Sequence, residues 1–145
     1  MRVVLDTNIL ISACWKPGGL ERQLVDLALA GHFDWVATQS VMDEYVEVLN
    51  RPKFKQLRAS IDTLLERFAG KVRIVPVAAS IALAHDPDDN LLLEAAQAAA
   101  ADFLVTGNLK DYPLDWPVAR IVNARQFFEL VQVHGLGGAV VKPIE

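Results

Sequence analysis

Six acidic residues of this chain stand where their carboxylates could meet, because each lies near the predicted end of a strand or in the first turns of a helix. They are Asp6, Glu44, Asp86, Asp88, Asp89 and Asp111. Carboxylates a few ångströms apart resist joint ionisation unless a cation neutralises them. Mg²⁺ and Mn²⁺ prefer carboxylate and water oxygens, and such an ion can generate hydroxide and stabilise charge on a phosphoryl group. The acids therefore predict a divalent-metal site suited to hydrolysis.

The sequence offers no comparable zinc site. It has one cysteine, Cys14, and its three histidines show no metal-ligand spacing. A single cysteine also excludes an internal disulfide and fits a reducing cytoplasm.

Short apolar runs alternate with amphipathic stretches along the chain, which predicts an α/β fold. Strands are expected at residues 2–5, 34–37, 72–77, 103–106 and 119–122. Helices are expected at residues 8–13, 20–30, 39–51, 60–69, 88–101 and 124–133. This alternation indicates a parallel sheet with helices on both faces. Ligands bind such a sheet at the carboxyl ends of its strands, where Asp6 and the turn at 106–108 fall.

Length and composition fit one globular domain. The chain has 145 residues, of which 52% are hydrophobic and 22% charged, enough to bury a core. No apolar run approaches a membrane span, and no signal peptide is expected because the first apolar run ends at Asp6. We expect a cytoplasmic protein with a domain at residues 1–133. The C-terminal tail at 134–145 is either an end without regular structure or an extra strand.

Each polar candidate also has a purely structural interpretation. Asp6 could cap the helix that follows it, and Glu44 could be a solvated charge on a helix face. At least one acid of the DPDDN stretch at 86–90 is expected to cap the helix that it introduces. The turn at 106–108 could simply follow a strand. Only their joint placement at one sheet edge favours a shared site.

Three segments, in order, resemble the signatures of PIN-domain proteins. They are VVLDTNILISA at 3–13, TQSVMDEYVEVLNRPKF at 38–54 and DPDDNLLLEAAQAAAADFLVTGN at 86–108. The resemblance covers residues 2 to about 128 and is closest to VapC-like ribonucleases, the toxins of toxin–antitoxin pairs. It implies a five-stranded parallel sheet, an acidic pocket for Mg²⁺ or Mn²⁺, and cleavage of RNA by a metal-activated water. It also implies an antitoxin protein as partner and self-association.

The resemblance assigns catalytic and metal-binding roles to three acids, Asp6, Glu44 and Asp89. Asp86, at the start of the same turn as Asp89, is a lesser supporting candidate.

The fourth acidic position of many relatives is Asn108 in this chain. An amide can orient water or phosphate but adds no charge. Relatives with this asparagine carry an acid three residues later, which makes Asp111 the candidate fourth metal ligand. Asn8, Thr106 and Asn108 are then expected to support the carboxylates and water by hydrogen bonds.

One stretch is locally basic in a chain whose net charge is −4. It contains no acid, has Phe54 interleaved, and carries the basic residues Arg51, Lys53, Lys55 and Arg58. Cations beside an aromatic ring could hold the RNA backbone and stack on a base. The alternative is an ordinary solvated connection between helices.

Other functions remain open on the sequence. A haloacid-dehalogenase-like phosphatase needs a second acid two residues after the first, where this chain has Asn8. A receiver domain needs its aspartate after the third strand, where this chain has Val-Pro-Val at 75–77. The stronger alternative is a PIN-like domain that is catalytically weak or inactive because of Asn108 and acts as a partner-binding module. Metal affinity separates the active from the inactive domain.

Overall fold

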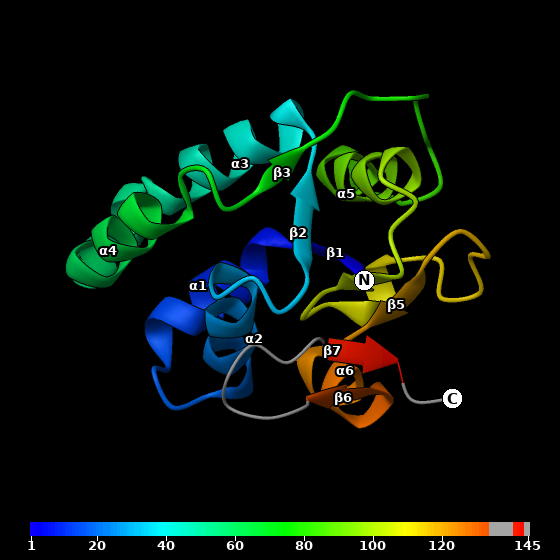
Figure 1. Ribbon diagram of the computed structural model, residues 1–145. Helices are drawn as coiled ribbons and strands as arrows, with labels where there is room; N and C mark the ends of the chain where they lie inside the picture. The colour runs from blue at the N-terminus through cyan, green and yellow to red at the C-terminus, as the bar shows by residue number, and fades with distance from the viewer. Residues whose placement is uncertain (134–140, 144–145) are drawn as a thin grey trace.

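A computed structural model describes residues 1–133 and 141–143. Its centre is a five-stranded parallel sheet with the strand order β3-β2-β1-β4-β5 (Figure 1). The strands are β1 Arg2–Leu5, β2 Asp34–Ala37, β3 Arg73–Ile74, β4 Phe103–Val105 and β5 Arg120–Val122. The predicted five-stranded parallel sheet is therefore confirmed.

Helices cover both faces of this sheet, as predicted. α3 and α5 lie on one face and α1, α2 and α6 on the other (Figure 1). The α-helices are α1 Thr7–Trp15, α2 Leu20–Leu29, α3 Gln39–Leu49, α4 Arg58–Phe68, α5 Pro87–Ala98 and α6 Ala124–Leu130. Two short 3₁₀ helices, η1 Pro52–Leu57 and η2 Leu109–Asp111, stand in segments expected to be connections. Within the described residues, no helix is long and apolar enough to cross a membrane.

The middle strand β1 is buried on both sides, which explains its run of apolar residues. Val3, Val4 and Leu5 have no exposed surface. At the end of β1, the buried Tyr45 hydroxyl of α3 donates a hydrogen bond to the carbonyl of Leu5. Trp35 of β2 packs beside the Tyr45 ring at 5.9 Å between centroids. These contacts fix α3 against the carboxyl end of the sheet.

The helix predicted at 88–101 ends at Ala98, and two other sequence-based elements also differ in the structure. The strand predicted at 72–77 is limited to β3, because the chain leaves the sheet edge after Val75 donates its N–H to Ala37. The helix predicted at 124–133 ends at Leu130, and Val131–Val133 forms a strand, β6. Valine at both ends of that segment favours extended backbone.

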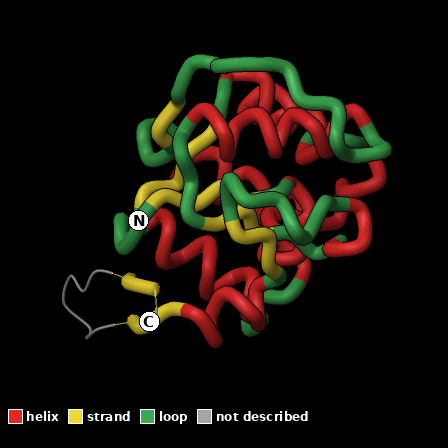
Figure 2. The backbone as a smooth tube through the Cα atoms, turned by 90° about the vertical axis from the view of Figure 1, so that its right-hand side faces the viewer, coloured by secondary structure: helices red, strands yellow, loops and turns green. Residues whose placement is uncertain are grey.

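β6 pairs antiparallel with β7, Val141–Pro143, in a separate two-stranded sheet. This pair lies apart from the five-stranded sheet (Figure 2). Of the two possibilities for the tail, a strand is therefore present at 141–143. Residues 134–140 and 144–145 of the tail lie outside the described residues, and the domain boundary at 133 stays a prediction.

Candidate active site

The register of the two central strands places Asp6 beside Thr106. Leu5 pairs with Val105, so the residues that follow each strand leave the sheet side by side. The Asp6 backbone N–H donates to the Val105 carbonyl at 2.9 Å, and Thr106 Oγ1 donates to Asp6 Oδ2 at 2.7 Å. Asp6 is only 7% exposed. Rigid strands thus fix a buried carboxylate at the carboxyl end of the sheet.

Asp6 Oδ2 receives two further side-chain donors. The Tyr112 hydroxyl lies at 2.7 Å and Asn8 Nδ2 at 3.3 Å. Burial raises the pKa of Asp6 above its ordinary value, while the bonds from Thr106 and Tyr112 act in the opposite direction. Although Asp6 precedes α1, its side chain makes no capping hydrogen bond. Its shortest side-chain contacts are thus with the hydroxyls of Thr106 and Tyr112.

Asn8 links the residues that follow β1 and β4 through two hydrogen bonds. Its Nδ2 donates to Asp6, while its Oδ1 accepts the Gly107 N–H at 2.9 Å. Thr106 also accepts the Asn108 N–H, at 3.1 Å. The turn at 106–108 is thus more than a plain connection, since its hydroxyl and backbone hold Asp6 and Asn8 in place.

Glu44 reaches the same edge from α3. Thr38 caps this helix by accepting the Val41 N–H at 3.3 Å, and Thr7 Oγ1 donates to Glu44 Oε2 at 3.0 Å. The pKa of Glu44 is raised to about 7, chiefly by burial and further by the charges of Asp6 and the two aspartates that begin α5. Glu44 therefore faces the other acids and is not simply a solvated helix charge.

The amino terminus of α5 supplies Asp89. Asp86 caps this helix, because its Oδ1 accepts the Asp88 N–H at 2.9 Å. The pKa of Asp89 is raised to about 6, first by burial and next by the charge of Asp6. The capping role expected for one acid of this turn falls to Asp86, and Asp89 is left to face Asp6.

The fourth acid position is less closely tied to the site. The side chain of Asn108 is exposed, and Asp111 is exposed in η2. The charge of Asp111 contributes to the raised pKa of Asp89, so it acts on the site electrostatically.

Two contacts at the site were not predicted from the sequence. Thr7 holds Glu44, and Tyr112 contacts both Asp6 and Asp89, at 2.7 and 3.2 Å. Tyr112 directly follows η2 and is 6% exposed. The sequence shows only that an aromatic residue, Tyr112, follows Asp111. Spacing alone does not give the direction in which a side chain points from a loop.

The chemistry of these donors fits a hard divalent cation. Asp6, Glu44 and Asp89 come from three separate parts of the chain. The charges of Asp6 and Asp89 raise the pKa of Glu44, and the charge of Asp6 raises that of Asp89. Carboxylate oxygens are the ligands that Mg²⁺ and Mn²⁺ prefer. In residues 1–133 and 141–143, however, no group of three or more His, Cys, Asp or Glu side chains is drawn together as a metal cluster. Between Asp6 and Asp89 lies the hydroxyl of Tyr112.

The basic stretch forms η1 and the start of α4. Arg51 pairs with Glu47 at 2.8 Å and Arg58 with Asp62 at 2.7 Å, so these two charges are partly neutralised. Lys53 Nζ lies 5.1 Å from the centre of the Phe54 ring. Together with the hydrogen bond to Glu47, the charges of Asp88 and Glu44 are among the causes that raise the pKa of Arg51, so the basic stretch lies close enough to interact with these acids.

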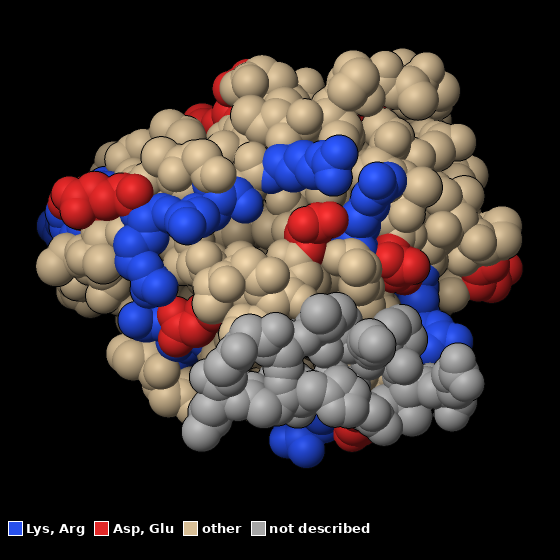
Figure 3. All heavy atoms as spheres, in the orientation of Figure 1, with Lys and Arg blue, Asp and Glu red and all other residues tan. Residues whose placement is uncertain are grey.

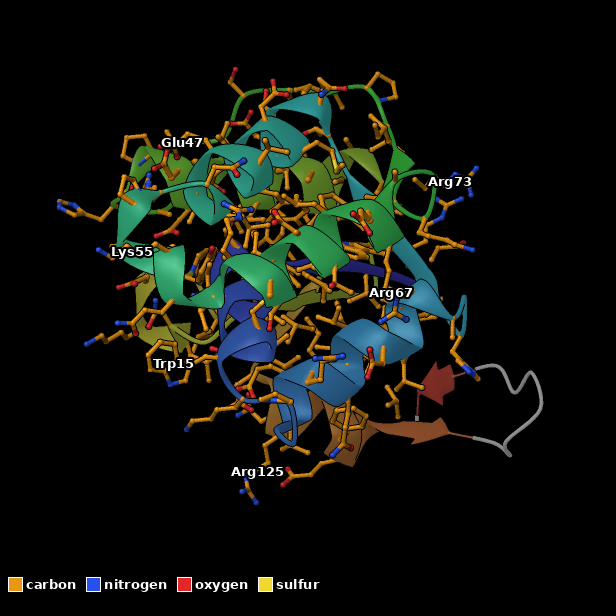
Figure 4. The ribbon with its side chains drawn as sticks, turned by 90° about the vertical axis from the view of Figure 1, so that its left-hand side faces the viewer. Trp15, Glu47, Lys55, Arg67, Arg73 and Arg125 are labelled. Carbon is orange, nitrogen blue, oxygen red and sulfur yellow. The ribbon has the colours of Figure 1, made fainter. Side chains whose placement is uncertain are left out.

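An exposed tryptophan accompanies this stretch. Trp15, at the end of α1, is 59% exposed. Figure 4 shows Trp15, Lys55 and Glu47 along the same side of the molecule, with Arg73 at the opposite side. An exposed aromatic ring is suited to stacking on a nucleobase.

Comparison with known proteins finds a matching family and a similar fold. A family model described as PIN domain matches residues 2–110. Among solved structures, the chain is similar to one in the crystal structure of VapBC2 from Rickettsia felis bound to a DNA fragment from their promoter. The TM-score is 0.58 at 20% sequence identity, with 85% of this chain and 98% of that chain covered. At this identity the likeness concerns the fold. No curated protein matches the chain significantly.

Proposed function

The chain belongs to the PIN domain family, and from that premise we propose that it is a metal-dependent endoribonuclease. The observation that carries the proposal is the convergence of Asp6, Glu44 and Asp89 at the carboxyl end of the sheet, where burial raises each pKa. Neighbouring carboxylates with raised pKa values are typical of functional sites.

Asp6, Glu44 and Asp89 would hold Mg²⁺ or Mn²⁺, with Asp111 as an outer ligand. A bound divalent cation supplies an activated water and stabilises charge on the phosphoryl group. The protein supplies orientation: Thr106 and Asn8 hold the Asp6 carboxylate, and Thr7 holds that of Glu44.

We further propose that the protein is the toxin of a toxin–antitoxin pair in the cytoplasm, with a cognate antitoxin and a second copy of itself as partners. The sequence resemblance to VapC-like ribonucleases and the fold of the VapBC2 structure support this assignment. RNA would lie along η1, where Lys53 and Lys55 accompany Phe54.

Cleavage of a mixed cellular RNA pool tests the enzyme directly. The purified protein is incubated with Mn²⁺, with Mg²⁺ and with EDTA, beside Asp6→Asn and the control Asp43→Asn. Asp43 is exposed on the same helix as Glu44, so the control removes one charge outside the site. We expect metal-dependent cleavage that Asp6→Asn lowers more than about a hundredfold, since even residues behind a metal ligand are worth tenfold or more. A folded wild-type protein that cleaves no RNA under any metal would contradict the proposal.

A catalytically inactive partner-binding module is the second candidate. Asn108 replaces an acid at the fourth position, which lowers the charge available to a metal. Mn²⁺ binding that is absent from the wild-type protein, together with retained binding of an antitoxin, would favour this function.

A further inference from the structure

The Tyr112 hydroxyl bridges two of the three candidate metal ligands. It lies 2.7 Å from Asp6 Oδ2 and 3.2 Å from Asp89 Oδ1. The side chain is almost fully buried, so water does not compete freely for these contacts. The Tyr112 N–H bonds to the Leu109 carbonyl at 3.2 Å, which anchors the backbone where η2 ends.

A phenol has one proton, so Tyr112 can bond both carboxylates only by sharing it. It lessens the repulsion between them but adds no positive charge. Asp6 Oδ2 already accepts from Tyr112, Thr106 and Asn8, so its lone pairs are taken up. A cation that lies between Asp6 and Asp89 therefore has to displace the Tyr112 hydroxyl, which occupies that position.

We propose that Tyr112 is a positioning residue that holds Asp6 and Asp89 together without metal and must release at least one of them when a cation binds. Tyr112 thus stabilises the metal-free protein and lowers its affinity for the cation. This inference rests on the proposed function, because it concerns the same carboxylates.

Thr106 offers a matched comparison within the same site. Its hydroxyl donates to the same oxygen, Asp6 Oδ2, at the same 2.7 Å. Thr106 also accepts from the Asn108 N–H, and within the described part of the chain it makes no hydrogen bond to Asp89. Removing either hydroxyl takes one donor from Asp6, but only the Tyr112 change opens the space between the two acids.

Mn²⁺ binding to the full chain, measured by isothermal titration calorimetry, tests this role independently of cleavage. The variants are Tyr112→Phe, Thr106→Val and Asp6→Asn. We expect Tyr112→Phe to bind Mn²⁺ about tenfold more tightly than wild type, the scale of one hydrogen bond to a charged group. Its melting temperature without metal should fall, and saturating Mn²⁺ should raise it more than in wild type. Thr106→Val should gain no affinity.

Several outcomes would overturn the role of Tyr112. Equal or weaker Mn²⁺ binding by Tyr112→Phe excludes competition, and a similar gain by Thr106→Val would show that any lost donor suffices. In both cases the proposed ribonuclease survives if Asp6→Asn abolishes binding. Failure of both wild type and Tyr112→Phe to bind Mn²⁺ would overturn the role of Tyr112 and the proposed metal site together. Binding by Tyr112→Phe alone would support the role.

Discussion

The three candidate ligands share one oxygen-rich edge but differ in how they are held. Asp6 is fixed by donors from three side chains, Glu44 by Thr7, and Asp89 by a longer bond to Tyr112. Rigidity therefore decreases from the strand end toward the two helices. Because these carboxyl groups are buried near one another, the free energy of unfolding of the metal-free protein depends on whether they are protonated.

Stability without metal should fall as pH rises through the titration of Glu44. Its pKa is raised from 4.5 to about 7 in the folded protein, so the folded state binds the proton more tightly than the unfolded chain. The contribution is complete below pH 4.5 and is lost as pH approaches 7. Since the group is only half-buried, we expect a loss on the order of 1–2 kcal/mol. Urea unfolding in EDTA at several pH values measures it.

Glu44→Gln is the matched variant for this measurement, because it keeps the shape and removes the titration. Its free energy of unfolding should change less than that of wild type over the same pH range. An unchanged slope in the variant would show that Glu44 does not cause the pH dependence.

The candidate ligands could be predicted from sequence because they are tied to elements that the sequence reveals. Asp6 follows an apolar strand, and Asp89 begins an apolar helix, so sheet topology brings them to one edge. The contact of Tyr112 could not be predicted, because it depends on the turn of a short 3₁₀ helix and joins residues 106 positions apart. Thr7 raised the same difficulty, since its rotamer decides whether it meets Glu44.

At the scale of elements, α5 positions Asp89 through its first turn. Asp86 accepts the Asp88 N–H, and Pro87 stands at the first helical position, where its fixed φ favours helix and its missing N–H costs nothing. The cap and the proline together fix where the helix starts. The direction in which Asp89 points follows from that start.

Replacing Asp86 should show whether it acts by capping α5 or through its negative charge. We expect Asp86→Ala to lower the free energy of unfolding by about 1 kcal/mol, the usual value of a cap, while Asp86→Asn restores most of it. Both changes can be followed by urea denaturation, with RNA cleavage assayed in parallel. If Asp86→Asn is stable yet loses cleavage as severely as Asp6→Asn, Asp86 acts through its charge and the capping explanation is insufficient.

The alternation of strands and helices was enough to predict the sheet and its covered faces. The errors fall where local preference and tertiary context disagree. The run at 72–77 is apolar enough for a longer strand, but an edge strand has a partner on one side only and ends when the chain turns away. The helical pattern from Ala124 continues past Leu130, yet pairing with β7 makes 131–133 a strand.

At the scale of the whole molecule, the net charge is −4, and acidic and basic side chains are mixed over the surface. On the face in Figure 3, basic and acidic side chains alternate. Two of the surface ion pairs join Arg67 to Asp26 and Arg73 to Asp34. An RNA backbone finds little net attraction on such a surface, which directs attention to the basic stretch in η1.

Removing Lys53 and Lys55 together should weaken RNA binding without changing turnover. We expect the Lys53→Ala, Lys55→Ala double variant to raise KM and to reduce the slope of log affinity against log salt by about 1 to 2, because each lost phosphate contact contributes about 0.7 on single strands. The measurements are cleavage kinetics and RNA titration at several salt concentrations.

A double variant of Arg73→Ala and Arg125→Ala serves as the control, since it removes the same charge from positions well separated from Lys55 (Figure 4). Equal effects in the two double variants would mean that overall charge, rather than the η1 stretch, governs RNA binding.

The hydrogen bonds that hold Asp6 join residues far apart in the sequence, so they can form only late in synthesis. Thr106 and Tyr112 follow Asp6 by 100 and 106 positions, so the carboxylate emerges long before two of its partners exist. Ribosomes add about 5–20 residues per second, which leaves an interval of about 5 to 20 seconds when the early carboxylate lacks these donors. The contacts that hold Asp6 therefore cannot be complete until residue 112 has been added.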